Sequence, residues 1–369
     1  MIDRGELAAW LRLIETPSLG REAARRLLAA FGSPEVVITA TSAARREVVG
    51  SKAATALDQV APQTLPALID STWAWLCADP ARHDVIPLGD PRYPAMLLEA
   101  PDPPLLLYVR GRAELLHADA IAIVGSRSPT AQGTENAQAF AQHLSAAGLT
   151  VVSGLALGVD AAAHTGALEG ASSTIAVVGT GLDQIYPRRN RKLGERIGIE
   201  GLIVSEYPLG MPPLANNFPQ RNRIIAGLTR GTLVVEAALQ SGSLITARLA
   251  NEAGREVYAI PGSIHAPQSR GCHALIKQGA KLVETAQDIL EELRLVPASG
   301  ATAAITCDSS GDASDPLLAA LGHDPATLDA LAARTGLTAA ALSVRLLDLE
   351  LSGYVARLPG QLFQRLTRA

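Results

Sequence analysis

Ile121-Ala122-Ile123-Val124-Gly125-Ser126-Arg127 is a short apolar run that ends at a glycine, a serine and an arginine. Similar apolar runs follow along the chain, separated by helical segments, at 150–152, 174–178, 202–204, 233–235 and 257–260. Short runs rich in β-branched residues that alternate with helices are typical of a parallel sheet with right-handed crossovers. The sequence therefore predicts an α/β fold, with a doubly wound, parallel, Rossmann-like sheet over residues 119–295.

Other units are predicted on both sides of this sheet. Residues 1–68 favour a small helical domain of the helix-hairpin-helix or sterile-alpha-motif type, whose turn at 18–21 either approaches a phosphate or simply joins two helices. The Pro-rich residues 69–118 are expected to extend the edge of the central domain. Residues 296–314 are small and polar, as in a flexible linker, and residues 315–369 predict a winged-helix-like domain with three helical segments and a hairpin.

The role of the C-terminal domain stays open at this stage. Its longest helical segment, 338–352, contains Arg345 as its one basic residue, against Asp348 and Glu350. Phosphate contacts dominate nonspecific affinity for nucleic acid, so this helix is poorly suited to DNA. Protein contact or packing is at least as well supported.

Composition limits the classes of protein to consider. The 369 residues are 48% hydrophobic with a formal net charge of −4, so a globular chain with a sizeable core is expected. No apolar run has the length of a membrane span, and the start lacks the layout of a signal peptide, so we expect a cytoplasmic protein with no membrane contact. Three scattered cysteines, Cys77, Cys272 and Cys307, argue against a disulfide framework and a thiolate metal site. We predict no metal and no cofactor.

The charge is unevenly distributed along the chain. Residues 181–230 contain eight basic residues against four acidic ones, a local excess of four positive charges in an acidic protein. A solvated helical face and a binding site for a polyanion both explain such a cluster. Its position relative to the strand ends has to decide between them.

Small and polar residues follow the ends of the predicted strands. The clearest are Gly125-Ser126-Arg127, Ser153-Gly154, Gly179-Thr180-Gly181 and Ser241-Gly242-Ser243. In open parallel sheets, ligands bind beyond the carboxyl ends of the strands, where helix N-termini present free N–H groups. The first turn is not Gly-x-Gly-x-x-Gly, and the chain has no Gly-x-x-x-x-Gly-Lys-Ser/Thr, so dinucleotide and Walker-type nucleotide binding lose support.

Basic and aromatic residues accompany these turns. Arg127 is placed to reinforce an anion site, although an ion pair with Glu206 or Glu236 is the alternative. Phe218 is either a core residue or a platform on which a base stacks. Arginine with an aromatic group suits a ligand that combines phosphates with flat rings.

The ordered set of these blocks resembles the bacterial DNA-processing protein A family, DprA, also called Smf. The resemblance covers about half of the chain and rests on Gly125-Ser126-Arg127, 153–160 with His164, 179–183 with Tyr186-Pro187 and Asn190, Ser205-Glu206-Tyr207-Pro208, 218–227, Glu236 with 241–247, and Pro261-Gly262. Where this family carries a C-terminal winged helix, a glycine often stands at the position of Gln361.

The resemblance implies a protein of natural transformation that binds incoming single-stranded DNA, protects it and helps the RecA recombinase to load, without chemistry on the DNA. It also implies a homodimer formed through the Rossmann-like domain, and a phosphate contact at Arg127. Residues and resemblance together predict a DNA-binding site with no catalytic residue, formed by Gly125, Ser126, Arg127, Ser153, Gly154, Gly181, Arg188, Asn190, Phe218, Arg221, Asn222, Arg223, Ser241 and Ser243.

An enzyme is the competing hypothesis. Carboxylates near the strand ends, Asp160, Asp183, Glu206 and Glu236, suit a magnesium-dependent nuclease or a Rossmann-type nucleotide hydrolase of the phosphoribohydrolase kind. The Pro-Gly-Gly-x-Gly-Thr turn expected of the hydrolase is absent from the sequence. His164 and His273 lack the spacing of a metal site or triad and are interpreted as core or helix-cap histidines.

Overall fold

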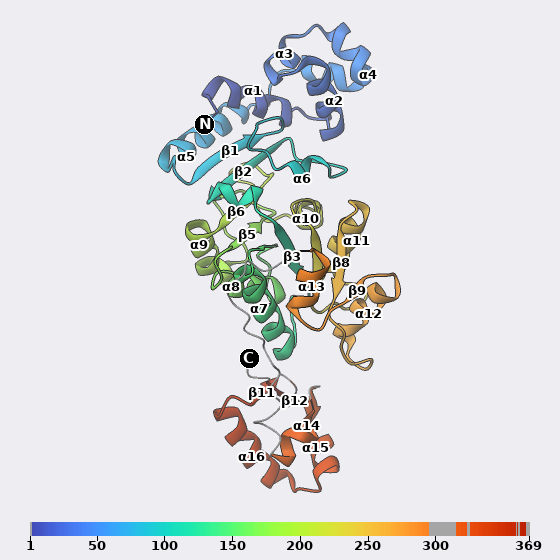
Figure 1. Cartoon of the computed structure of the whole chain (residues 1–369). Coiled ribbons are helices and arrows are strands. Elements are labelled where there is room, and N and C mark those ends of the chain that lie inside the picture. The colour runs from blue at the N-terminus through green and yellow to red at the C-terminus, as the bar shows by residue number, and fades with distance from the viewer. Residues whose placement is uncertain (1, 295–314, 323–324, 359, 361, 367–369) are drawn as a thin grey trace.

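The computed structural model describes residues 2–294, 315–322, 325–358, 360 and 362–366 (Figure 1). The linker predicted at 296–314 and Gln361 lie outside the described residues.

The centre of the molecule is a nine-stranded sheet in the order β1-β2-β6-β5-β4-β3-β7-β8-β9. Seven of its strands run parallel to one another, which confirms the predicted doubly wound sheet: β3 (Ala120–Val124), β4 (Thr150–Ser153), β5 (Thr174–Val177), β6 (Leu202–Ser205), β7 (Gly231–Val234), β8 (Glu256–Ala259) and β9 (Lys281–Leu282). The strand order reverses between β3 and β7. In open α/β sheets such a reversal leaves a crevice at the carboxyl ends of the two strands.

The Pro-rich segment adds two strands to the edge of this sheet. Strand β1 (His83–Pro87) pairs with β2 (Leu106–Gly111), and β2 pairs with β6, both in antiparallel register. The segment also forms the short helices α6 (Ala95–Leu98) and η1 (Ala113–His117). The predicted extension of the edge is therefore a direct continuation of the sheet.

Helices cover both faces of the sheet, because alternate residues of each strand point to opposite sides. Ile121 and Ile123 pack in one core, and Ala122 and Val124 in another. The first face carries α7 (Ala131–Ala146), α8 (Val159–Ala167), α9 (Arg191–Glu200) and α13 (Ala286–Glu292). The second face carries α10 (Asn217–Gly227), α11 (Ser243–Glu252) and α12 (Arg270–Lys277), and the turns η2 (Arg188–Asn190) and η3 (Pro267–Ser269) join elements at the carboxyl ends of the strands.

The N-terminal helices share a core with the edge of the sheet. They are α1 (Arg4–Ile14), α2 (Arg21–Phe31), α3 (Pro34–Thr39), α4 (Ser42–Asp58) and α5 (Leu65–Ala78). The boundary predicted at residue 68 falls inside α5, where Trp75 stacks on His83 of β1 with ring centroids 4.1 Å apart. The turn before α2 has positive φ at Ser18 and Gly20, which explains the glycine there.

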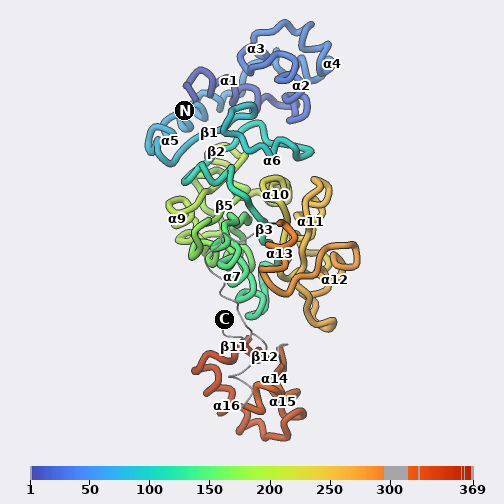
Figure 2. The backbone as a smooth tube through the Cα atoms, viewed as in Figure 1, coloured from blue at the N-terminus to red at the C-terminus, as the bar shows by residue number. Residues whose placement is uncertain are grey.

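The C-terminal residues form the predicted three helices and hairpin. The elements are α14 (Pro316–Leu321), β10 (Ala326–Thr327), α15 (Leu328–Thr335), α16 (Ala339–Leu351), β11 (Val355–Leu358) and β12 (Leu362–Arg365), with strand order β10-β12-β11. Figure 2 shows this unit at the opposite end of the molecule from α1–α5. Within the described ranges, no single helix has the length and apolar character of a membrane span, whereas the bent pair α15–α16 meets those two criteria.

Candidate nucleic-acid interface

A cavity of about 400 Å³ opens at the point where the strand order reverses. We call it the first cavity. Its walls come from the turn after β3, the N-terminal turns of α10 and α11, and the start of α8. Seven of the predicted site residues line it: Gly125, Arg127, Phe218, Arg221, Asn222, Ser241 and Ser243.

Arg127 is exposed at the first cavity, and its guanidinium forms no ion pair or hydrogen bond with the residues that the structure describes. The two carboxylates that sequence analysis offered as partners are occupied. Glu206 pairs with Arg223, and Glu236 accepts hydrogen bonds from the N–H and hydroxyl of Thr130 at 3.0 and 2.5 Å. Arg127 is therefore available to a ligand.

The turn that presents Arg127 is held by close backbone packing. A Cβ atom on Gly125 would lie 2.7 Å from Cγ2 of Val159, so a larger residue does not fit there. Ser126 accepts a hydrogen bond on its carbonyl from the N–H of Val159, at 3.1 Å, and on its hydroxyl from the N–H of Ser128, also at 3.1 Å. Ser126 shapes the turn and does not line the cavity.

Arg221 borders the first cavity and is buried, and its role as a direct DNA contact stays a prediction. Its Nη1 donates to the carbonyl of Gly154 at 2.7 Å and to that of Val177, and its Nε donates to Oδ1 of Asn222 at 3.0 Å. Burial lowers the pKa of Arg221 to about 10. The negative charge of Asp160 raises this pKa, and the positive charge of Arg127 lowers it further. The group thus stays charged near neutral pH, and its charge adds to the positive potential of the cavity.

Three further groups fix the turn at residues 154–156. Asp160 accepts hydrogen bonds from the N–H groups of Gly154 and Ala156, at 3.1 and 3.3 Å. Asn190 donates through Nδ2 to the carbonyls of Leu155 and Ala156, at 2.9 and 3.0 Å, and is only 8% exposed. Asn190, predicted as a DNA contact, therefore holds the turn instead. We call the buried groups Asp160, His164, Asn190 and Arg221 the supporting layer of the first cavity.

His164 is a core histidine, as the sequence interpretation held. Its Nε2 accepts the N–H of Leu155 at 3.2 Å, so the proton of the neutral ring lies on Nδ1, which contacts Oγ1 of Thr174 at 2.7 Å. The Thr174 hydroxyl donates in turn to the carbonyl of Val151. Burial, with the nearby charge of Arg221, lowers the pKa of His164 to about 3.

Two glycines and a serine of the predicted site serve packing. Ser153 is fully buried and donates to the carbonyl of Ile123 at 2.6 Å. A Cβ on Gly154 would lie 2.3 Å from Nη2 of Arg221, so glycine leaves room for that guanidinium. Gly181 is buried, and a Cβ there would lie 2.6 Å from the carbonyl oxygen of Pro208. None of the three lines the first cavity.

Arg223 does not line the first cavity, and its role as a DNA contact stays a prediction. It pairs with Glu206 and, at 3.2 Å, with Asp102 of the Pro-rich segment. Arg21 and Arg25 of α2 bind the same Asp102. Burial raises the pKa of Glu206, although the arginines lower it. This cluster joins the N-terminal helices to α10, and its three arginines share the two carboxylates Asp102 and Glu206.

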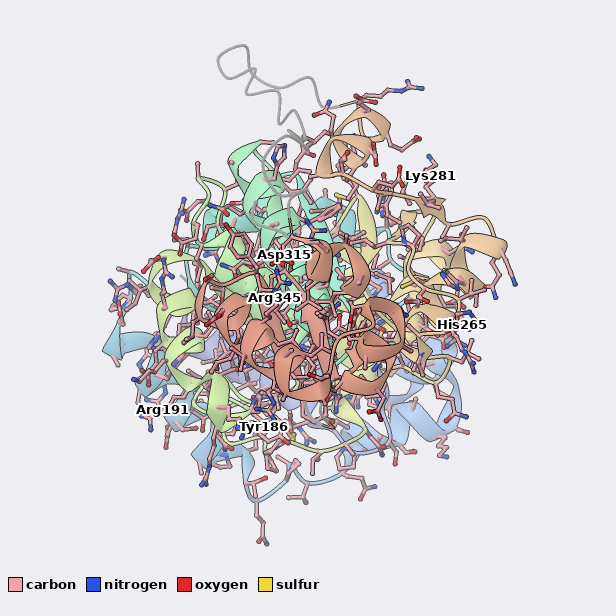
Figure 3. All side chains as sticks on the ribbon, turned by 90° about the horizontal axis from the view of Figure 1, so that it is seen from below. Tyr186, Arg191, His265, Lys281, Asp315 and Arg345 are labelled. Carbon is pink, nitrogen blue, oxygen red and sulfur yellow. The ribbon has the colours of Figure 1, made fainter. Side chains whose placement is uncertain are left out.

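Phe218 is half-buried, lines the first cavity and contacts Tyr186, with ring centroids 5.6 Å apart. Arg188 lies beyond Tyr186 and lines a second cavity of about 1180 Å³. Figure 3 shows Tyr186 and Arg191 on one flank of the molecule, away from His265 and Lys281. Arg188 is thus separated from Arg127 by two aromatic rings.

The serines before α11 supply the remaining wall of the first cavity. Ser241 Oγ lies 2.7 Å from Ser243 Oγ and accepts the N–H of Ser243 at 3.3 Å. The helix spans Ser243–Glu252, its N-cap residue is Gly242, and the N–H groups of Ser243, Leu244 and Ile245 are bonded to Ser241 and Gly242. The positive end of the helix dipole therefore faces the cavity, while these N–H groups have internal partners.

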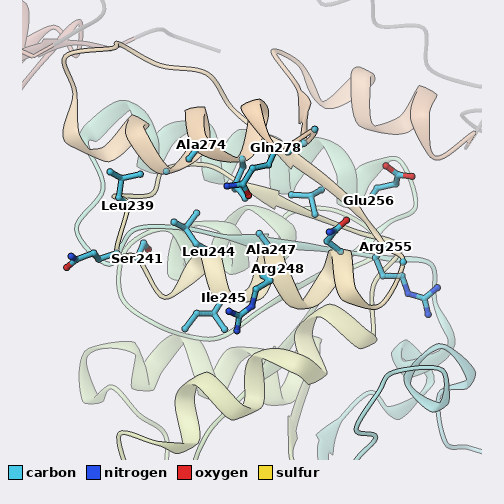
Figure 4. A pocket seen from close by; sticks show the side chains of 18 residues that line it. Leu239, Ser241, Leu244, Ile245, Ala247, Arg248, Arg255, Glu256, Ala274 and Gln278 are labelled. Carbon is cyan, nitrogen blue, oxygen red and sulfur yellow. The ribbon is translucent and has the colours of Figure 1, made fainter.

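A groove between α11 and α12 lies beside the first cavity, with a volume of about 690 Å³. Ser241, Leu244, Ala274 and Gln278 face it (Figure 4). Ser241 borders both spaces, and Leu239 at the rim of the groove is 59% exposed. The sequence interpretation did not identify this groove.

Sequence reasoning also missed Arg110, which lines the second cavity with Arg188 and Arg191. Arg110 lies on β2, between β1 and β6, and no motif surrounds it in the sequence. Tyr186 was considered only as part of the family resemblance. The antiparallel pairing of β2 with β6 positions Arg110, and this pairing has no signal in neighbouring residues.

The carboxylates that suggested metal or hydrolase chemistry have internal partners. Within the described ranges, no group of three or more His, Cys, Asp and Glu side chains is placed to hold a metal ion. Glu236, which follows β7, holds the N-terminus of α7, where a Cβ on Gly133 would lie 2.4 Å from its carboxyl carbon. Its oxygens are committed to Thr130.

Comparisons with known proteins agree with this geometry. The family described as DNA recombination-mediator protein A matches residues 84–294, and the DprA winged helix domain matches residues 301–361. Protein Smf of Escherichia coli K12 is 44% identical over 309 residues, which cover 82% of each chain. The DNA processing protein DprA of Streptococcus pneumoniae is 51% identical over 203 residues, which cover 55% of this chain and 72% of that protein.

Solved structures give the same result for the fold. The X-ray structure of DprA from Streptococcus pneumoniae superposes with a TM-score of 0.66 at 40% identity, covering 76% of this chain and 95% of that one. A structure of DNA processing protein A from Helicobacter pylori, described for its single-stranded DNA binding mode, gives 0.53 at 32% identity, with 57% and 95% covered. The ordered motifs, the doubly wound sheet and these matches together place the chain in the DNA recombination-mediator protein A family, also known as DprA or Smf.

Proposed function

We propose that this chain binds single-stranded DNA in the first cavity, as a recombination mediator of natural transformation. One observation carries the proposal: Arg127 presents an open guanidinium beside a half-buried phenylalanine, where the strand order reverses. The guanidinium suits a backbone phosphate, and the ring suits a base. The N-terminus of α11 adds the positive end of its helix dipole to the same anion site.

Binding, without chemistry on the DNA, is the activity that we propose. Of the four carboxylates that suggested an enzyme, Glu206 and Glu236 are held by internal partners, and Asp160 is held by the turn at 154–156. Asp183 accepts the N–H of Gly210. A nucleotide hydrolase is the alternative, and release of free base or phosphate that is lost in Glu236→Gln would favour it.

Fluorescence anisotropy with a labelled oligonucleotide tests the binding. We expect single strands to bind far better than duplex, without ATP or metal, and with affinity that falls steeply as salt rises. Arg127→Ala should weaken binding by about 1.5–3 kcal/mol, the usual contribution of a charge-assisted hydrogen bond. Arg82→Ala is the matched control, because Arg82 is exposed on the sheet edge and pairs with Asp79. Equal affinity of wild type and Arg127→Ala would contradict the site.

The proposed role extends to loading of RecA in the cytoplasm. On single-stranded DNA coated with a single-strand-binding protein, addition of this protein should shorten the lag before RecA begins DNA-dependent ATP hydrolysis. Arg127→Ala should lengthen the lag again, because the mediator must hold the strand to present it. A lag that does not respond to wild-type protein would contradict this role while leaving DNA binding intact.

We also propose a homodimer formed through the Rossmann-like domain, as the family resemblance implies. Exposed Leu239 at the α11–α12 groove supports a contact there, because a second copy would bury it. Sedimentation equilibrium should show a dimer that Leu239→Glu converts to monomer. If Leu239→Glu remains a dimer, the dimer contact lies outside the α11–α12 groove.

A further inference from the structure

The second cavity contains arginines that the protein itself does not neutralise. Arg110 and Arg188 both line it, and neither guanidinium forms an ion pair or hydrogen bond with the described residues. Arg191 also lines the cavity but pairs with Glu195 at 2.9 Å. Asp183 there is occupied by the N–H of Gly210 at 2.9 Å. Three arginines and two carboxylates, Asp183 and Glu195, line the cavity, so its lining has a formal net charge of +1, and the guanidinium groups of Arg110 and Arg188 are unpaired with the described residues.

Arg110 is held in place by the sheet and by α9. Its backbone pairs with Ile203 of β6, so the residue lies on a rigid strand rather than on a loop. A Cβ on Gly198 would lie 3.1 Å from Nε of Arg110, so the absence of a side chain at Gly198 lets the guanidinium lie against α9. Arg110 is half-buried, and a partly desolvated, unpaired cation there is suited to an anionic ligand.

An aromatic pair connects the two cavities. Phe218 lines the first cavity and Tyr186 lines the second, and their rings lie 5.6 Å apart at an angle of 37°. Tyr186 is 45% exposed, so part of its ring is open to a ligand. Alternation of cations and aromatic rings suits a single strand, whose phosphates and bases recur along its length.

We propose that one DNA strand continues from the first cavity across Phe218 and Tyr186 into the second cavity, where Arg110 and Arg188 bind its phosphates. This inference rests on the proposed function, and it adds a second binding subsite to it. The ligand class is a single strand long enough to reach both cavities. Shorter strands occupy the first cavity alone.

The test measures affinity against strand length. Labelled oligothymidines of increasing length are titrated by fluorescence anisotropy with wild type, Arg110→Ala and Arg112→Ala. Arg112 is the matched control, because it follows the same strand but pairs with Glu114 at 2.9 Å and donates to the carbonyl of Glu200. Thermal unfolding establishes that each variant is folded, and Arg110→Lys, which retains the charge, is the second variant if Arg110→Ala is unstable.

We expect Arg110→Ala to weaken binding of long strands about fivefold to tenfold and to leave the shortest bound strands unchanged. Loss of one phosphate contact should also reduce the slope of log affinity against log salt by roughly 0.7 for the long strands only. Arg112→Ala should match wild type at every length, and Arg110→Lys should lie between wild type and Arg110→Ala.

Two outcomes overturn the proposal. If Arg110→Ala binds long strands as tightly as wild type, the strand does not reach the second cavity. If it weakens all lengths equally, Arg110 acts through general charge and not as a subsite. Either result is compatible with DNA binding in the first cavity, provided that Arg127→Ala weakens the binding of strands of every length. If Arg127→Ala is also without effect, the proposed function itself fails.

Discussion

Arg127 and Arg221 both border the first cavity, yet their guanidinium groups have opposite surroundings. Arg127 is exposed and has no partner among the described residues, whereas Arg221 is 4% exposed and is held by two carbonyl groups and Asn222. The first is free for a ligand and the second is part of the supporting layer. Of these two arginines, Arg127 is therefore available for binding, and Arg221 stabilises the fold. Substitutions at each position test this difference.

The largest effect is expected from Arg221→Met. The change leaves Asp160 buried without its positive neighbour and removes the donor to the carbonyls of Gly154 and Val177. Removal of one partner from a buried charge pair typically costs about 3–5 kcal/mol of stability. Urea unfolding followed by circular dichroism measures it, with Gln220→Met, at an exposed position of the same helix, as the control. A loss below about 1 kcal/mol would show that Arg221 is not structural.

Acidification is expected to weaken the supporting layer through His164. The folded pKa of His164, about 3, lies below its ordinary value of 6.5, so the unfolded chain binds a proton first as pH falls. This contribution to stability is complete above pH 6.5 and is lost progressively toward pH 3. Between pH 7 and pH 5 the loss is about 2 kcal/mol, at roughly 1.4 kcal/mol per pH unit.

The effect of His164 is measured against His164→Gln, whose side-chain oxygen can still accept the N–H of Leu155. Burial raises the pKa of Asp160 and Glu206, and these carboxyl groups act in the opposite sense. The slope of unfolding free energy against pH is therefore read as the difference between the two proteins. Parallel slopes between pH 7 and pH 5 would contradict the assignment.

A smaller effect is expected from Asn190→Ala, which removes two hydrogen bonds to the turn at 154–156. The two carbonyls of this turn then lack a donor, and we expect a loss of about 1–3 kcal/mol in unfolding free energy. Arg189→Ala, at the exposed neighbouring position, is the control. A variant of full stability that binds DNA poorly would return Asn190 to the list of direct contacts.

The smallest change in stability is expected from Arg127→Ala, within about 0.5 kcal/mol, because the side chain is exposed and unpaired with the described residues. The same variant is expected to lose single-strand binding, as described above. Urea unfolding of the variant used for anisotropy gives both values from one preparation. A large destabilisation would remove the contrast between Arg127 and Arg221.

Much of the fold was predictable because its signals are local. The apolar runs of the central strands need only their own residues to be recognised, and each lies within about two residues of the strand that forms. The three helices and hairpin of the C-terminal unit have the same local origin. The boundary predicted at residue 68 lies inside α5, because this helix follows the helical unit in sequence but packs on β1 of the sheet. Such a long-range contact has no local signal.

The candidate site was predictable only in part. The strand exits indicated which segments meet, and seven of the predicted residues do line the first cavity. The direction of each side chain was not predictable. Arg223 belongs to the same motif as Phe218, but it pairs with Asp102 of the Pro-rich segment. Asn190 follows Tyr186-Pro187, and its side chain is bonded to the turn at 154–156.

The sequence by itself determined the class of fold, the family and the turn that carries Arg127, because strand periodicity and turn residues are encoded in consecutive positions. Only the tertiary structure decided which arginines remain unpaired and exposed. Whether an arginine is paired depends on carboxylates and carbonyls that are distant in the sequence. Asp102 forms an ion pair with Arg223, and the carbonyl of Val177 accepts a hydrogen bond from Arg221. Strand β2 places Arg110 in the same cavity as Arg188. Whether a cation is unpaired depends on the groups that surround it in the folded protein, and no pattern of neighbouring residues in the sequence predicts it.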